Sequence, residues 1–191
     1  MNKALIIVDV QLDFCPGGSL AVPNGDEVVE PLNKLSNHAR KNGWSIFVSR
    51  DWHPPVTKHF KNFGGIWPVR CVAESKGAEF HCDLDISNSI IVSKGMGNND
   101  DYSAFDGVTE GLPLRYALQA KNVDELFIGG LATDYCVKET VLSACKFGFK
   151  VNFLKDASRA VNISINDEDT AINEMKKLGA RIITVDEALN G

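Results

Sequence analysis

One stretch of this chain decides its fold: Asp124-Glu-Leu-Phe-Ile-Gly-Gly-Leu-Ala-Thr-Asp-Tyr-Cys-Val-Lys-Glu-Thr140. Residues 126–128 form an apolar run that predicts a short buried strand, and Gly129 and Gly130 interrupt it. From about Cys136 onward, apolar residues recur at helical spacing. A buried strand that turns directly into a helix is the repeating unit of a parallel α/β sheet.

Strand and helix signals alternate along the rest of the chain. Helical periods are centred on residues 28–43, 114–118 and 167–178. Six strands are predicted, at residues 4–10, 45–49, 90–92, 126–128, 151–154 and 181–185. Strands that alternate with helices imply crossover connections. We therefore expect one α/β domain over 1–191: a mainly parallel, doubly wound six-stranded sheet with helices on both faces, giving three α-β-α layers.

Composition narrows the function classes. The chain has 191 residues, 44% hydrophobic and 24% charged, which is ordinary for a globular protein. A net charge of −5 argues against nucleic acid or an anionic membrane as partner. No apolar run approaches the ~18–20 residues that span a bilayer, and the apolar start predicts a strand rather than a signal peptide. Five cysteines without C-x-x-C spacing favour a reducing, cytoplasmic location.

Reactive side chains follow the predicted strands. Asp9 ends the first strand, Asp51 and His53 follow the second, Lys94 follows the third and Cys136 the fourth. Ligands of open α/β sheets bind beyond the carboxyl ends of the strands, so these side chains are expected in one pocket. Taken singly, each has a structural explanation: a turn cap for Asp9, turn hydrogen bonds for Asp51 and His53, and a solvated position for Lys94.

Cys136 is the candidate nucleophile. A cysteine near a helix start is favoured as thiolate, with a pKa lowered to roughly 3.5–7.5. The alternative is a buried, inert cysteine. Asp9 and Lys94, expected to end neighbouring strands, could take the thiol proton and hold the charge. Attack on a carbonyl would give a thioester that water hydrolyses, with backbone N–H groups of Ala132 and Cys136 as oxyanion hole.

Several motifs together resemble the nicotinamidase/pyrazinamidase branch of the isochorismatase-like hydrolases. They are Asp9-Val-Gln-Leu-Asp-Phe14, Arg50-Asp-Trp-His-Pro54, Gly64-Gly-Ile-Trp-Pro68, Lys94-Gly95, Tyr102-Ser-Ala-Phe105 and Gly130-Leu-Ala-Thr-Asp-Tyr-Cys-Val137. The resemblance implies a three-layer fold, an Asp-Lys-Cys triad at Asp9, Lys94 and Cys136, and a cis peptide near Leu131-Ala132. It also implies a substrate pocket formed by Phe14, Leu20, Trp67 and Tyr102.

The resemblance further implies a divalent transition metal (zinc, manganese or iron) held by Asp51, His53 and His59. Arg70, however, stands where the family has its last histidine ligand, and a guanidinium cannot ligate a cation. Three outcomes follow: a site of three protein ligands plus water, weak metal binding, or an Arg70 that binds a polar or anionic part of the substrate.

Three functions remain open. The first is hydrolysis of nicotinamide to nicotinate and ammonia, which would feed NAD salvage. The second is a related amidohydrolase of carbamoyl or ureido compounds, suggested by Arg70. The third is a non-catalytic redox sensor built on the Cys136 thiol. The enzyme hypotheses imply a small-molecule amide as partner, and the chain could form a homo-oligomer.

Overall fold

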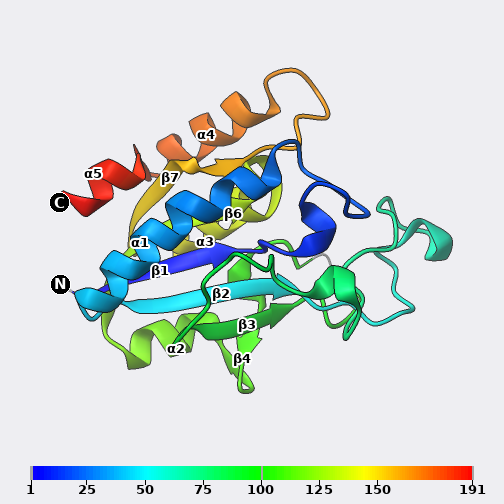
Figure 1. Cartoon of the computed structure of the whole chain (residues 1–191), viewed down its shortest axis with the longest axis horizontal. Coiled ribbons are helices and arrows are strands. Elements are labelled where there is room, and N and C mark those ends of the chain that lie inside the picture. The colour runs from blue at the N-terminus through cyan, green and yellow to red at the C-terminus, as the bar shows by residue number, and fades with distance from the viewer. Residues whose placement is uncertain (1, 100, 191) are drawn as a thin grey trace.

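The computed structural model describes residues 2–99 and 101–190, and its centre is one eight-stranded sheet (Figure 1). The strand order across the sheet is β5-β4-β3-β2-β1-β6-β7-β8. The strands are β1 (Asn2–Val8), β2 (Ser45–Asp51), β3 (Ile90–Lys94), β4 (Val108–Thr109), β5 (Leu112–Pro113), β6 (Val123–Leu131), β7 (Lys150–Arg159) and β8 (Arg181–Ile183).

The six predicted strands are all present as β1, β2, β3, β6, β7 and β8. They pair in parallel with their neighbours in the sheet order β3-β2-β1-β6-β7-β8. The hairpin of β4 and β5 extends the sheet antiparallel beyond β3 and was not predicted. Its strands have two residues each, too short for a periodic pattern. The local signal was the turn: Glu110 and Gly111 both have positive φ (49° and 80°), as a two-residue type I′ hairpin turn requires.

Helices cover both faces of the sheet, as the alternating pattern predicted. They are α1 (Val29–Lys41), α2 (Leu114–Ala120), α3 (Lys138–Lys146), α4 (Asp167–Lys177) and α5 (Val185–Leu189). Side chains of β1 alternate between the two layers: Leu5 and Ile7 pack into a core with α1 and α5, whereas Ala4, Ile6 and Val8 pack into a second core with α2, α3 and α4. The helices α1 and α3 accordingly lie on opposite sides of the sheet in Figure 1.

One helix was missing from the prediction. The last strand ends at Ile183, and Thr184 then caps α5. The Thr184 hydroxyl accepts from the Glu187 N–H (3.2 Å), and the Glu187 carboxylate accepts from the Thr184 N–H (2.7 Å). This reciprocal capping box could have been read from the Thr-x-x-Glu spacing.

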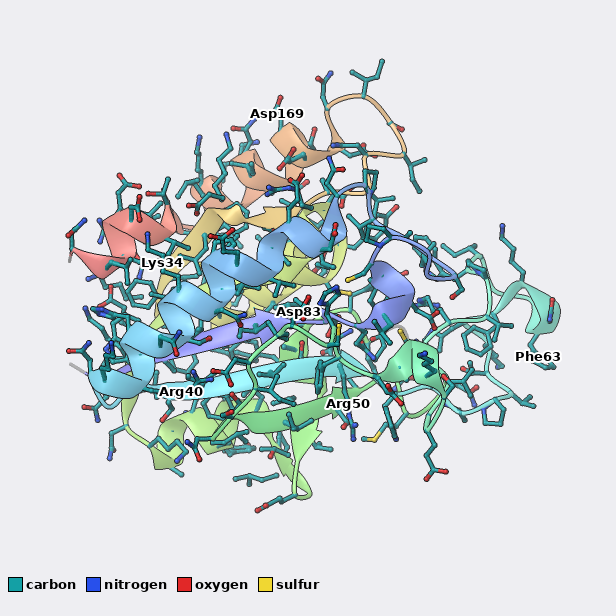
Figure 2. All side chains as sticks on the ribbon, viewed as in Figure 1. Lys34, Arg40, Arg50, Phe63, Asp83 and Asp169 are labelled. Carbon is teal, nitrogen blue, oxygen red and sulfur yellow. The ribbon has the colours of Figure 1, made fainter. Side chains whose placement is uncertain are left out.

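The first part of the long irregular segment of residues 52–89 reaches past the carboxyl ends of the parallel strands, and its last part runs back along the sheet to the start of β3 (Figure 1). Phe63 lies at its outer tip (Figure 2). Phe60 and Trp67 form an isolated parallel bridge within the segment. The segment thus stands beside the sheet edge where the reactive side chains were expected. Across the described residues, no helix combines the length and apolar character needed to cross a bilayer.

Candidate active site

The predicted reactive residues meet at the carboxyl edge of the sheet. Lys94 is the last residue of β3, Asp51 the last of β2, and Asp9 follows β1 directly, with a positive φ of 49°. Cys136 lies in a π-helical turn, Thr133–Val137, between β6 and α3. The expectation that Asp9 and Lys94 end neighbouring strands was wrong, because β2 lies between β1 and β3. That intervening strand brings Asp51 into the group.

Lys94 joins the other charged groups. Its Nζ lies 2.8 Å from Asp9 Oδ2, 2.5 Å from Asp51 Oδ1 and 3.6 Å from Cys136 Sγ. Lys94 and Asp9 are buried, so each charge depends on these partners rather than on water. One ammonium therefore holds two carboxylates and touches the candidate nucleophile.

Burial and neighbouring charges decide the protonation of the group. Burial raises the pKa of Asp9 above its usual value of 3.8, although Lys94 opposes the shift. Burial also disfavours the Lys94 ammonium, yet the carboxylates of Asp51 and Asp9 hold its pKa well above 10.5. For Asp51 the balance reverses: burial is outweighed by Lys94, His53 and Arg70, and its pKa is lowered. The resting site contains an ionised Asp51 beside an ammonium.

The expected low pKa of Cys136 is not what this environment produces. Burial raises its pKa well above 9.0, and the nearby Asp9 and Asp51 add to the rise, while Lys94 only partly offsets it. The sequence suggested a thiolate at a helix start, but the sulfur is enclosed beside two carboxylates. Burial and the two carboxylates therefore favour the protonated thiol over the thiolate.

Two buried polar residues that the sequence did not single out support the carboxylates. Ser49, on β2, donates its hydroxyl to Asp9 Oδ1 at 2.7 Å. The Gln11 side chain accepts from the Asp51 N–H (2.8 Å) and donates to the Asp51 carbonyl (2.9 Å). Gln11 lies within the quoted Asp9–Phe14 motif, so its place in that motif was the available signal.

The Cys136 sulfur lies at a small, mostly apolar pocket that is open to solvent. Every predicted substrate-pocket residue lines it: Phe14, Leu20, Trp67, Arg70 and Tyr102. Trp67 donates its indole N–H to the Tyr102 hydroxyl at 2.9 Å, and Tyr135 packs edge-on against Trp67 with ring centroids 5.2 Å apart. The remaining lining residues are Val22, Asp51, Leu131, Ala132, Tyr135, Cys136 and Val161. A flat aromatic substrate fits such walls.

The predicted oxyanion-hole residues lie at the same pocket. The peptide bond between Leu131 and Ala132 is cis, as expected. Ala132 and Cys136 both line the pocket, and the Ala132 carbonyl accepts from the Val137 N–H at 3.1 Å to close the π turn. Thr140 donates its hydroxyl to the Cys136 carbonyl at 2.7 Å, which fixes the turn that carries the sulfur.

The predicted metal ligands are only partly assembled. His53 Nδ1 donates to the Gly95 carbonyl (2.8 Å), which turns Nε2 toward Asp51 Oδ2 at 3.2 Å. The rings of His53 and His59 lie 4.8 Å apart between centroids. However, ligand atoms of Asp51, His53 and His59 are not all within 4.8 Å of one another, whereas Arg70 Nη2 lies 3.5 Å from Asp51 Oδ2. Arg70 therefore forms an ion pair with Asp51, one of the predicted ligands.

A different set of potential metal ligands lies close together in the described part of the chain. His81, Cys82 and Asp83 have ligand atoms within 4.8 Å of one another, on a largely exposed loop. None of the three lines the pocket that holds Cys136. The Asp83 N–H donates to His81 Nδ1 at 3.3 Å.

The sequence and the fold of this chain are similar to those of known proteins. The Isochorismatase domain model matches residues 3–187. The nicotinamidase of Escherichia coli (strain K12) is 39% identical, with 96% of this chain and 95% of the relative covered. The nicotinamidase/pyrazinamidase of Mycobacterium tuberculosis is 35% identical, with 95% and 98% covered. Among solved structures, the Pyrococcus horikoshii pyrazinamidase in complex with zinc has a TM-score of 0.88 at 39% identity, covering 96% of this chain and 99% of that one.

These matches extend over nearly the whole chain, and they agree with the motifs and the three-layer fold. The chain belongs to the isochorismatase family, in its nicotinamidase/pyrazinamidase branch, and is a nicotinamidase-like amidohydrolase.

Proposed function

We propose that this chain hydrolyses nicotinamide to nicotinate and ammonia, a step of NAD salvage, through a covalent thioester on Cys136. One observation carries the proposal: Lys94 Nζ contacts both Asp9 and Cys136 Sγ, and Cys136 lines a pocket with aromatic walls. In that setting Cys136 is the nucleophile, Asp9 the proton acceptor and donor, and Lys94 the group that holds the charges together.

The reaction begins with a proton transfer. Because burial raises the pKa of both Cys136 and Asp9, the thiol keeps its proton until substrate arrives, and the Asp9 carboxylate is basic enough to accept it. The sulfur then bonds to the amide carbon while the carbonyl electron pair moves to oxygen. Backbone N–H groups of Ala132 and Cys136 are proposed to bind that oxyanion.

Collapse of this intermediate breaks the C–N bond. Ammonia leaves with the proton from Asp9, and a thioester to Cys136 remains. A water molecule then gives a proton to Asp9, and its oxygen bonds to the thioester carbon. The second collapse breaks the C–S bond, and the released thiolate of Cys136 takes the proton from Asp9 to become a thiol again. The sum is one amide plus one water to one carboxylic acid and one ammonia, with Asp9 and Cys136 regenerated.

The pocket walls support an aromatic amide. Phe14, Leu20 and Trp67 offer flat or branched apolar surface, and Tyr102 is held against Trp67 by a hydrogen bond. Stacking on such side chains would orient the ring so that its amide carbon faces the sulfur. The reacting group then lies where Lys94 and Asp9 can act on it.

The zinc complex of the Pyrococcus relative suggests that a divalent metal could also bind in this site, at Asp51, His53 and His59. His53 supports it, because a ligating histidine usually donates its other ring N–H to a carbonyl, as His53 does to Gly95. Yet the residues as arranged do not fit the ion. Asp51 already contacts Lys94 and Arg70, and the three ligand atoms are not gathered. No step of the reaction is therefore routed through a metal.

The two other functions have weaker support. Arg70 in the pocket would suit a carboxylate and so favours carbamoyl compounds as a second substrate class. A redox sensor needs an exposed thiol of low pKa, whereas Cys136 is buried and its pKa is raised.

The test is ammonia release from nicotinamide and from a panel of carbamoyl and ureido compounds. Cys136→Ala should abolish release. Cys145→Ala is the matched control, since Cys145 lies on the following helix and does not line the pocket. Near-normal turnover by Cys136→Ala would disprove the covalent mechanism, and faster turnover of a carbamoyl compound than of nicotinamide would select the alternative substrate class.

A further inference from the structure

Arg70 is a buried cation with unused donors at the substrate pocket. Its side chain is only 6% exposed, and it lines the same pocket as Cys136. Nη2 approaches Asp51 at 3.5 Å, and the guanidinium carbon lies 5.5 Å from the Trp67 ring centroid. Within the described part of the chain, Nε and Nη1 have no hydrogen-bond partner. Buried donors are costly to leave unsatisfied, so a molecule that enters the pocket gains by accepting from them.

The backbone holds Arg70 in this place. The N–H of the next residue, Cys71, donates to Asp13 Oδ2 at 2.7 Å, and the Cys71 carbonyl accepts from the His53 N–H at 2.9 Å. Arg70 is thus anchored between the loop that carries Asp13 and the loop that carries His53. Its guanidinium is positioned at the pocket by these neighbours rather than extended into solvent.

The charges of the site balance with Arg70 included. With His53, which lies 3.2 Å from Asp51, counted as neutral, Asp9 and Asp51 are its two acids, and Lys94 and Arg70 are its two cations. With all four ionised the sum is zero, and a divalent ion would leave an uncompensated charge of two in a buried site. With a neutral histidine at position 70 the sum would be minus one, which attracts a cation. A balanced site also has no excess positive charge to draw in an anionic substrate.

We propose that Arg70 replaces a metal ion in this enzyme and selects neutral aromatic amides whose ring carries a hydrogen-bond acceptor. The guanidinium donates an N–H to that ring acceptor while the amide lies at Cys136. This inference rests on the proposed amide hydrolysis, and it makes Arg70 a specificity-determining residue. It predicts binding that distinguishes nicotinamide from benzamide, which has a C–H in place of the ring nitrogen.

The test measures binding by calorimetry, in the Cys136→Ala background, so that it does not depend on turnover. Nicotinamide should bind roughly 10- to 100-fold more tightly than benzamide, the range expected for one hydrogen bond to a charged donor. Adding Arg70→Met, which removes charge and donors at similar length, should bring the two affinities within about threefold. Arg50→Met is the control, because the Arg50 guanidinium stacks on Trp52 at 3.6 Å and does not line the pocket.

A second measurement uses metal content and needs no ligand. Purified native protein, equilibrated with zinc and then dialysed, should retain well under one ion per chain, whereas Arg70→His should retain about one. Equal zinc retention by the two proteins would overturn the replacement of a metal by Arg70. An unchanged preference for nicotinamide in Arg70→Met would overturn the selection of the ring acceptor. If Arg70→Met does not fold, Arg70→Gln takes its place, since it removes the charge and keeps a polar side chain.

Failure of the proposed hydrolysis gives a different result. In that case the native protein releases no ammonia from nicotinamide, while the affinities and the zinc content still test Arg70.

Discussion

Ser49→Ala tests whether Asp9 controls proton transfer. The Ser49 hydroxyl donates to Asp9 Oδ1 at 2.7 Å, and both side chains are 0% exposed. This bond favours the ionised form of Asp9 and so lowers its pKa against the larger effect of burial. Removing the hydroxyl should therefore raise the pKa of Asp9 further. Because Asp9 acts as base only when ionised, the acid limb of kcat/KM should move to higher pH.

The size of the shift follows from the bond. A hydrogen bond to a charged group contributes about 1.5–3 kcal/mol, and one pKa unit corresponds to about 1.4 kcal/mol. A protonated Asp9 still accepts from Ser49, so only part of that energy distinguishes the two forms. We expect an upward shift of about 1 pH unit, with little change in the rate at the plateau.

The assay is ammonia release from nicotinamide as kcat/KM across pH, for the native protein, Ser49→Ala and Ser93→Ala. Ser93 is a matched control, since it is also a strand serine but accepts from Arg50 and does not bond to the catalytic group. A limb that stays in place or moves to lower pH in Ser49→Ala would refute the assignment of Asp9 as the base. An equal shift in Ser93→Ala would show that the change is not specific to the bond.

Lys94→Met should abolish turnover. It should also lower the free energy of unfolding, measured by urea titration, by about 3–5 kcal/mol, because it leaves two buried carboxylates without their cation. A fully active variant would disprove the triad. The raised pKa of Cys136 predicts that iodoacetamide alkylates it slowly at pH 7 and faster as the pH rises, as followed by mass spectrometry. Fast alkylation at pH 7 would instead support the thiolate prediction. Gly130→Ala should destabilise the fold by several kcal/mol, because an added Cβ would clash with the Val8 carbonyl. Gly97→Ala is the control: nothing lies within 4 Å of an added Cβ there, so stability should change by less than about 0.5 kcal/mol.

The sequence alone determined the architecture to a large extent. Continuous apolar runs and helical periods are local properties of the chain, and they correctly predicted six parallel strands with helices on both faces. Elements defined by two residues or by a cap, such as β4, β5 and α5, lacked a periodic pattern and were missed. Their signals were a turn and a capping box, which are equally local but shorter.

The sequence also identified side chains that meet at the carboxyl edge of the sheet and others that line the pocket. The carboxyl ends of parallel strands share one edge, so Asp9, Lys94 and Cys136 could be brought together without knowing any distance. The motifs likewise placed Phe14, Trp67 and their neighbours on its walls.

Only the tertiary structure decided which of those side chains contact one another and how these contacts shift their pKa values. The order of the strands inserts β2 between β1 and β3, and this makes Asp51 a partner of Lys94. The raised pKa of Cys136 depends on burial and on carboxylates more than 80 positions away in the chain, which no local pattern encodes. The bond from Ser49 to Asp9 and the closeness of Arg70 to Asp51 arise in the same way, since charge and desolvation act through space and not along the sequence.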